Sequence, residues 1–149
     1  MSEEATARHA LPNLFVRQAQ KEVTHNEALA RIDVLLHPVV EGWVTTPPAP
    51  NATDDGKCWL IKGPAIGAWA GKENQIARWS GGSWRYLNPV NGMTLWHVAD
   101  QVRLFYITTA WIKADAIAAP SGGSVIDVEA RIAVGLILGH LRQISNIPA

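Results

Sequence analysis

The sequence has little cysteine: Cys58 is the only one in 149 residues. One thiol cannot form a disulfide within the chain, and it cannot supply a cysteine metal cluster. We interpret Cys58 as a buried, half-apolar residue of a strand. The five histidines are not spaced as metal ligands, either with one another or with carboxylates. The sequence therefore indicates no cofactor and no metal site.

Long apolar runs and runs of one charge are also missing. No stretch of about 18 apolar residues exists, and the N-terminus is polar and acidic, so we predict neither a membrane insertion nor a secretory signal. Thirteen basic side chains balance thirteen acidic ones, and no two basic residues are adjacent. We therefore expect synthesis in the cytoplasm and no binding of nucleic acid or of an anionic membrane.

Catalytic motifs are missing as well. There is no Gly-x-Ser-x-Gly elbow, and Gly63, Gly67 and Gly71 have neither the dinucleotide nor the phosphate-loop spacing. We therefore predict that the protein is not an enzyme. A hydrolase acting on cell-wall polymer stays open as a third alternative, and it would need two carboxylates roughly 5 to 9 Å apart.

Tryptophan, in contrast, is abundant, with seven in the chain. Aromatic residues recur at a separation of 27 residues: Trp59, Trp69, Trp79 and Trp84 are followed by Tyr86, Trp96, Tyr106 and Trp111. This spacing predicts a duplicated unit over residues 59–85 and 86–112. Such a unit repeats bulk and shape rather than titratable chemistry, which suits a binding or assembly module better than an enzyme.

Two hairpins are predicted within these repeats. Residues 75–79 and 83–87 flank Ser80-Gly81-Gly82, whereas residues 102–107 and 110–113 flank Thr108-Thr109, so the second turn is expected to be of another type. Cross-strand pairs of Trp79 with Trp84 and of Tyr106 with Trp111 would fix the register. Further strands are predicted at 39–44 and 57–62, the latter with Cys58 and Leu60 on one face and Trp59 and Ile61 on the other. The proline-rich residues 45–56 are expected to form an exposed spacer.

One helix is predicted to start at a capping box, Thr24 with Glu27, and to end before Pro38. Its apolar face would carry Ala28, Leu29, Ile32, Leu35 and Leu36. A second helix is predicted over residues 125–145, capped by Ser124 with Asp127. The fold class is thus α+β. The chain divides into a polar arm (1–12), a helix plus Trp-rich β domain (13–113), a flexible linker (114–124) and a C-terminal helix (125–149).

The middle of the last helix, residues 132–139, carries no charge on any face. An ordinary surface helix keeps a polar face, so this helix either runs through the core or packs against copies of itself. We expect self-association into a homo-oligomer. The predicted interface residues are Val128, Ile132, Leu136, Ile137, Leu141 and Ile144.

Exposed tryptophans could instead stack on sugar rings or fill the pocket of a partner. Trp69 and Trp96 lie outside the predicted hairpins, so we expect these two to be exposed and to contact a ligand or partner. A glycan-binding module that recognises host surface polysaccharide is therefore the alternative function.

A segment at the start of the first predicted helix resembles an uncharacterised domain family found in structural proteins of tailed phages, prophages and gene-transfer agents. It reads Gln18-Ala19-Gln20-Lys21-Glu22-Val23-Thr24-His25-Asn26-Glu27-Ala28-Leu29. Members typically also carry a proline-rich stretch, Gly-Ala-Trp-Ala-Gly and Gly-x-Trp, which correspond to residues 47–50, 67–71 and 82–84. The resemblance covers residues 11–112 or so.

The resemblance implies a virion component that is made in the host cytoplasm, oligomerises and contacts other virion proteins and the cell surface. It implies a base or attachment module of a head spike or tail fibre, without distinguishing head from tail, and it carries over no catalytic residues. Many relatives place this domain before longer spike or fibre segments, whereas this chain ends soon after its last helix. That difference leads us to expect an anchor or base.

Overall fold

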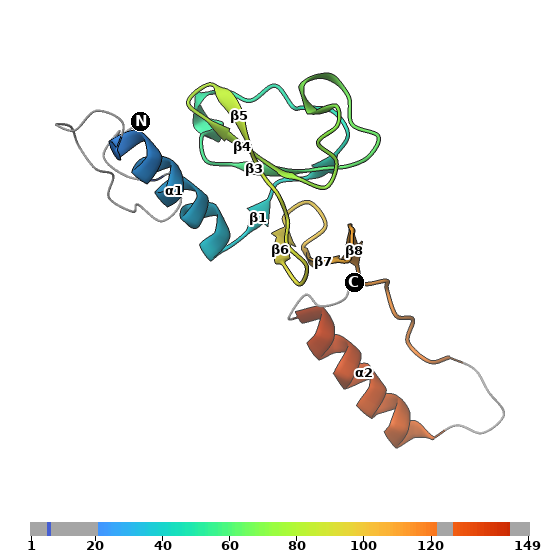
Figure 1. Ribbon diagram of the computed structural model, residues 1–149. Coiled ribbons are helices and arrows are strands. Elements are labelled where there is room, and N and C mark those ends of the chain that lie inside the picture. The colour runs from blue at the N-terminus through green and yellow to red at the C-terminus, as the bar shows by residue number, and fades with distance from the viewer. Residues whose placement is uncertain (1–5, 7–20, 122–126, 144–149) are drawn as a thin grey trace.

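The computed structural model of the protein describes residues 6, 21–121 and 127–143. They form an N-terminal helix, α1 (Lys21–Leu36), two small four-stranded sheets and a C-terminal helix, α2 (Val128–Gln143) (Figure 1). The protein is therefore α+β, as the sequence predicts.

The two sheets share one architecture. The first sheet has the order β2 (Trp43–Val44), β3 (Cys58–Ile61), β4 (Ile76–Ser80), β5 (Ser83–Leu87). The second has the order β1 (Val39–Val40), β6 (Thr94–His97), β7 (Val102–Ile107), β8 (Ala110–Lys113). In each sheet a two-residue strand runs parallel to the first strand of an antiparallel meander. The duplication is therefore one of whole sheets.

The single strand predicted at residues 39–44 is wrong, because the structure divides this segment between the sheets. Strand β1 pairs with β6, whereas β2 pairs with β3. The Trp96 amide donates to the Pro38 carbonyl (2.8 Å), and the Leu60 amide donates to the Gly42 carbonyl (2.9 Å). A short extended segment thus satisfies backbone groups of both sheets and ties them together.

The 27-residue repeat is confirmed for the hairpins only. Trp79 lies opposite Trp84 in β4 and β5, and Tyr106 lies opposite Trp111 in β7 and β8. The first two pairs of the series do not occupy equivalent positions in the two sheets. Trp59 and Tyr86 lie in strands of the same sheet. Trp69 lies in the 3-10 helix η2 (Gly67–Trp69), whereas Trp96 lies in strand β6. The predicted unit boundaries are therefore wrong.

Strand pairing shows why the repeat spacing changes. Leu60 pairs with Trp43 of β2, and Trp96 pairs with Val39 of β1, so Leu60 and Trp96 occupy corresponding positions 36 residues apart. The connection from β3 to β4 includes η2 and is longer than the turn from β6 to β7. A repeat of constant length cannot describe both the first strands and the hairpins.

The two hairpin turns differ, as predicted. Gly81 and Gly82 both have positive φ (56° and 77°), which is the type I′ pattern that matches strand twist. In the second turn Thr108 has a positive φ of 59°, and its amide donates to the Asn91 side chain (2.8 Å). The asparagine thus supports a backbone conformation that threonine rarely adopts.

The main core gathers side chains from both sheets and from α1. It consists of Val34, Val40, Cys58, Leu60, Ile76, Leu87, Leu95, Val102, Leu104 and Trp111. An outer cluster forms on the other face of the first sheet from Ile61, Trp69 and Ala77, with Trp59, Ala65, Trp84 and Tyr86 packed against it. The alternation predicted for β3 is confirmed, because Cys58 and Leu60 face the main core while Trp59 and Ile61 face the outer cluster.

Helix α1 differs from its prediction at the start. Thr24 lies inside α1, so the capping box predicted there is wrong. Glu27 instead accepts from Arg31, one turn further on, at 2.8 Å. The helix ends at Leu36, two residues before Pro38, as expected from the effect of proline on the preceding residue.

The apolar face predicted for α1 is also wrong. Val34 is fully buried in the main core, whereas Ile32, Leu35 and Leu36 are 47%, 43% and 52% exposed. Asp33 is buried beside Val34, where its carboxylate accepts from the Thr6 hydroxyl (2.8 Å). The helix therefore meets the core along a narrow edge and not along a broad apolar stripe.

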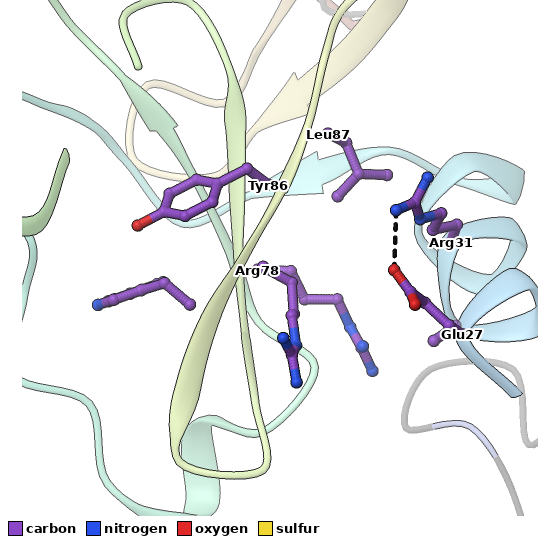
Figure 2. Close-up of a pocket in the computed structure, with 8 residues that line it drawn as sticks. Glu27, Arg31, Arg78, Tyr86 and Leu87 are labelled. Atoms are coloured by element: carbon purple, nitrogen blue, oxygen red, sulfur yellow. Dashed lines mark hydrogen bonds and ion pairs between the residues drawn. The ribbon is translucent and has the colours of Figure 1, made fainter. Parts of the chain in front are cut away.

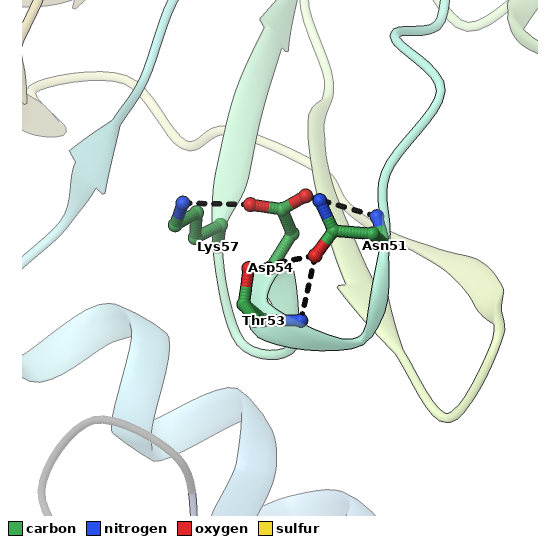
Figure 3. A network of polar contacts seen from close by, with 4 residues as sticks. All are labelled: Asn51, Thr53, Asp54 and Lys57. Carbon is green, nitrogen blue, oxygen red and sulfur yellow. Dashed lines mark hydrogen bonds and ion pairs between the residues drawn. The ribbon is translucent and has the colours of Figure 1, made fainter.

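The end of the predicted spacer is a fixed turn containing η1 (Ala52–Asp54) (Figure 3). The side chains of Asn51 and Asp54 both accept hydrogen bonds from the backbone of the turn. The Thr53 backbone N–H donates to the Asn51 side-chain oxygen (2.8 Å), and the Asn51 backbone N–H donates to the Asp54 carboxylate (2.9 Å). Lys57 pairs with Asp54 at 2.6 Å. Because Asp55 also accepts from the Gly81 amide (2.9 Å), the turn is attached to the β4–β5 hairpin.

After β8, residues 114–121 have no regular structure and lead toward α2. The carboxylate of Asp127 accepts from the Ala130 amide (2.9 Å) and caps α2, whereas Ser124 lies outside the described residues. Neither described helix has the length and hydropathy needed to cross a bilayer.

Candidate functional site

The surface of α2 carries most of the predicted interface. Val128, Ile132, Leu136 and Ile137 are 61%, 58%, 71% and 59% exposed. Leu141 is half-buried, and Ile144 lies outside the described residues. Figure 1 shows α2 standing apart from both sheets. Helix α2 therefore does not run through the core, and most of its apolar side chains face solvent.

One side of α2 is covered by the chain itself. Leu138 is 4% exposed. On the same side, Arg142 donates to the Ile117 carbonyl (2.9 Å), and Arg131 reaches the Pro120 carbonyl (3.5 Å). Successive residues of a helix are rotated by about 100°, which places Val128, Ile132, Leu136 and Ile137 away from the side of Leu138. The linker thus shields one side of the helix and leaves the others open.

Trp69 is fully buried, so its predicted exposure is wrong. Residues of the β3–β4 connection fold over the first sheet and bring Trp69 into the outer cluster. Trp96 is half-buried in β6 of the second sheet. The structure therefore does not bring the two residues together, and none of the seven tryptophans falls among the exposed residues.

Trp84 is the centre of a tryptophan group. Its ring centroid lies 5.4 Å from that of Trp59, 5.0 Å from that of Trp69 and 5.0 Å from that of Trp79, each in an edge-on arrangement. Tyr106 and Trp111 form the corresponding pair of the second hairpin at 5.2 Å. Edge-on aromatic pairs are favourable geometries, so these rings stabilise the fold, as the predicted hairpin staples should.

A pocket that the sequence reasoning missed lies between α1 and the β4–β5 hairpin (Figure 2). Its volume is about 260 Å³. In Figure 2, Glu27 and Arg31 extend from α1 toward the strands, while Tyr86 projects to the other side of the hairpin. The lining residues are Glu27, Ala30, Arg31, Arg78, Trp84, Arg85, Tyr86 and Leu87.

Three arginines and one glutamate give this pocket an excess of positive charge. Arg31 is paired with Glu27, but Arg78 and Arg85 lie directly opposite each other in β4 and β5. Like charges at directly opposite positions of a hairpin are destabilising. Such an arrangement lowers stability unless an anion lies near both guanidinium groups.

Arg78 is only 7% exposed, and its buried Nε–H has no hydrogen-bond partner within the described part of the chain. Leaving a buried donor unsatisfied costs roughly 1–3 kcal/mol, and more for a charged group. A guanidinium can bind a carboxylate or phosphate through two parallel N–H donors. The chemistry of the pocket therefore suits an oxyanion.

The pocket had a recognisable signal in the sequence. The turn at Gly81 and Gly82 fixes a two-residue hairpin, and that register places Arg78 opposite Arg85. The contribution of α1 had no such signal, because it depends on how the helix packs. Across residues 6, 21–121 and 127–143, no group of three or more His, Cys, Asp or Glu could hold a metal ion.

Comparison with known proteins identifies a family. No curated protein shows significant similarity to the chain. A family model described as "Protein of unknown function (DUF2793)" matches residues 25–112, which is more than half of the chain. The matched segment contains most of α1 and all but the last residue of the two sheets, including the residues that line the arginine pocket, and ends before α2. The chain therefore belongs to the DUF2793 family of proteins of unknown function.

Proposed function

We propose that the protein is a non-enzymatic structural component of a phage or gene-transfer-agent particle. In this proposal copies of the chain assemble through α2, and the assembly serves as the base or attachment module of a head spike or tail fibre. The observation that carries the proposal is the exposed apolar surface of α2.

The energetics of α2 favour assembly. Burying one large apolar side chain contributes roughly 1.5–3 kcal/mol, and four such side chains of α2 are more than half exposed. A helix of 16 residues is also only slightly longer than the roughly 12–15 residues below which isolated helices are marginal in water, so packing adds to its stability. Contact with neighbouring copies would cover these side chains and stabilise the helix.

The distribution of the apolar residues favours more than one neighbour. Val128, Ile132 and Leu136 follow one another at four-residue steps, whereas Ile137 lies on a different side of α2. A single partner helix would cover only part of this surface. A closed, rotationally symmetric bundle covers more of it, and closed symmetry is the rule for homo-oligomers.

The assignment to a virion is supported by the resemblance of residues 18–29 to phage and gene-transfer-agent structural proteins. Membership of the DUF2793 family is compatible with this assignment, since the family is defined without a function. The β sheets lie outside the proposed bundle and would be available for contact with other virion proteins.

The helix surface can be tested by point variants. We expect Ile132→Glu with Leu136→Glu to reduce the assembly to single chains, because both side chains are exposed and would bring charge into the interface. Light scattering after size-exclusion chromatography measures the mass. Ile107→Glu is the matched control: Ile107 is 51% exposed but lies in β7, so its variant should keep the wild-type mass. An unchanged mass for the helix variant would contradict assembly through α2.

The location in a particle needs a separate experiment. Purified particles carrying a tagged copy of this chain should bind gold-labelled antibody at a fixed place, seen by electron microscopy. Particles that never contain the tagged chain would reject the virion assignment while leaving the assembly result intact.

The alternative, a glycan-binding module, now depends on Trp96 alone, since Trp69 is fully buried. It is tested by binding of the wild type and Trp96→Ala to an array of surface polysaccharides. Loss of a specific signal without loss of fold would favour this alternative over the proposed structural role.

A further inference from the structure

We propose that the pocket between α1 and the β4–β5 hairpin binds a small ligand through a carboxylate or phosphate group. The site consists of Arg78 and Arg85 from the hairpin and Arg31 from α1. This inference does not depend on assembly through α2, because the pocket and α2 belong to different parts of the chain.

The first argument is the state of Arg78. Arginine is almost never buried without a partner, because removing its charge from water is costly. Arg78 is 93% buried, the complement of its 7% exposure, and its buried Nε–H has no hydrogen-bond partner in the described ranges. An oxyanion in the pocket would accept from its guanidinium group and offset the unfavourable proximity of Arg85.

The second argument comes from the duplicated hairpin. Strand pairing makes Phe105 and Ile112 the counterparts of Arg78 and Arg85, since each pair occupies the same register position relative to its turn. The same strand register is thus built with an apolar pair in the second sheet. The hairpin itself does not require two facing arginines, so their presence points to a role in binding.

The third argument is size. At about 260 Å³ the pocket is slightly below the range of typical small-molecule sites, roughly 300–1,000 Å³. It has room for one small acid, such as a sugar unit bearing a carboxylate or phosphate. Leu87 supplies an apolar wall beside the guanidinium groups.

The experiment is calorimetric titration of the full chain with glucuronate and with inorganic phosphate at constant ionic strength. Glucose serves as the neutral probe. We expect one or both anions to bind and glucose not to bind. Preference for glucuronate would indicate a carboxylate-bearing ligand, and preference for phosphate would indicate a phosphate-bearing ligand.

Variants locate the binding. Arg85→Gln and Arg31→Gln change exposed side chains, so they test the site without disturbing the core. Arg78→Phe with Arg85→Ile installs the pair that the second hairpin already carries. Each should weaken anion binding about tenfold or more, the effect of losing a hydrogen bond to a charged group. Arg103→Gln, in β7 of the other sheet, is the control and should bind as the wild type does.

Three results would overturn the proposal. The first is that neither anion binds the wild-type chain. The second is that Arg85→Gln and Arg31→Gln bind as the wild type does, or that Arg103→Gln weakens binding equally. The third is that a glutamate-rich peptide, titrated as a further probe, binds while glucuronate and phosphate do not, which would make the pocket a contact site for a protein segment and not for a small ligand.

Discussion

At the scale of single residues, hydrogen bonds and ion pairs stabilise the charged form of three carboxylates, those of Asp54, Glu73 and Asp100. Two hydrogen bonds lower the pKa of Asp54 below its usual value of 3.8: the larger effect comes from the backbone N–H of Asn51 and the smaller from the Lys57 ammonium. The hydrogen bond from Lys113, with a smaller effect of His97, lowers the pKa of Asp100. A carboxylate with a lowered folded-state pKa stabilises the fold above its unfolded pKa, and this contribution is lost as the pH falls through the folded-state value.

Asp54→Asn should therefore lower the melting temperature at pH 7, and its difference from the wild type should shrink as the pH falls below about 4. Thermal unfolding followed by circular dichroism across this range measures the effect. Asp115→Asn is the control, since Asp115 is exposed and its variant should match the wild type at each pH. A difference for Asp54→Asn that persists at low pH would show that the charge is not its cause.

Residue environments were predictable where neighbours along the chain determine them. The alternation of Cys58 and Leu60 against Trp59 and Ile61 follows directly from the pleat of a strand. The burial of Trp69 was not predictable, because it results from a long connection folding back over a sheet. The pairing of Arg78 with Arg85 could have been predicted from the hairpin register.

At the scale of elements, the β4–β5 hairpin depends on Trp84. This residue pairs across the strands with Trp79 and also contacts Trp59 and Trp69. It therefore links both strands of the hairpin to β3 and to η2. The second hairpin has one corresponding contact, between Tyr106 and Trp111.

Trp84→Ala should destabilise the protein by about 3 kcal/mol, the lower end of the range for truncating a large aromatic side chain, because Trp84 is only partly buried. Chemical denaturation followed by circular dichroism gives the free energy of unfolding. Trp84→Phe keeps an aromatic ring in place, so its free energy of unfolding should decrease clearly less than that of Trp84→Ala. Equal losses for the two variants would mean that the aromatic contacts are not what stabilises the hairpin.

Hairpins and their turns were predictable because they are local: turn residues and a run of alternating side chains specify them. The parallel pairs of β1 with β6 and of β2 with β3 were not, because parallel partners are distant in sequence. The prediction of which face of α1 is buried was also wrong. Only Val34 meets the main core closely, and helical periodicity cannot show how little of a helix is covered.

At the scale of the whole molecule, Asn74 links the two sheets. Its carbonyl accepts from the Trp111 indole (2.8 Å), and its side-chain amide donates to the Thr109 carbonyl (3.1 Å). Its φ is 68°, a conformation that asparagine tolerates better than most residues. The connection from β3 to β4 is thereby attached to the β7–β8 hairpin.

Asn74→Ala should cost about 2 kcal/mol, from one lost hydrogen bond and from the strain of a positive φ. Asn74→Gly removes the same hydrogen bond, but glycine adopts a positive φ without strain. The decrease in its free energy of unfolding should therefore be about 1 kcal/mol smaller than that of Asn74→Ala. Free energies of unfolding from denaturant titration compare them. If both variants unfold with the wild-type free energy, Asn74 does not couple the sheets.

The division of the chain into a β domain and a separate C-terminal helix also belongs to this scale. The β domain has two clusters of buried side chains, whereas Leu138 is the one apolar side chain of α2 that is buried within the described residues. The sequence predicted a separate C-terminal helix from the linker at residues 114–124, and the missing charges of residues 132–139 predicted self-association, which stays a prediction. It could not predict which side of α2 the linker covers.

Light scattering on the full chain, compared with a chain that ends at residue 113, tests the central claim most directly. We expect the full chain to have a mass that is a whole-number multiple of the single-chain mass across a dilution series. The shortened chain, which keeps both sheets and lacks α2, should have the mass of one copy. A full chain that stays a single copy at all concentrations, or a shortened chain that assembles equally, would contradict the claim that α2 joins the copies.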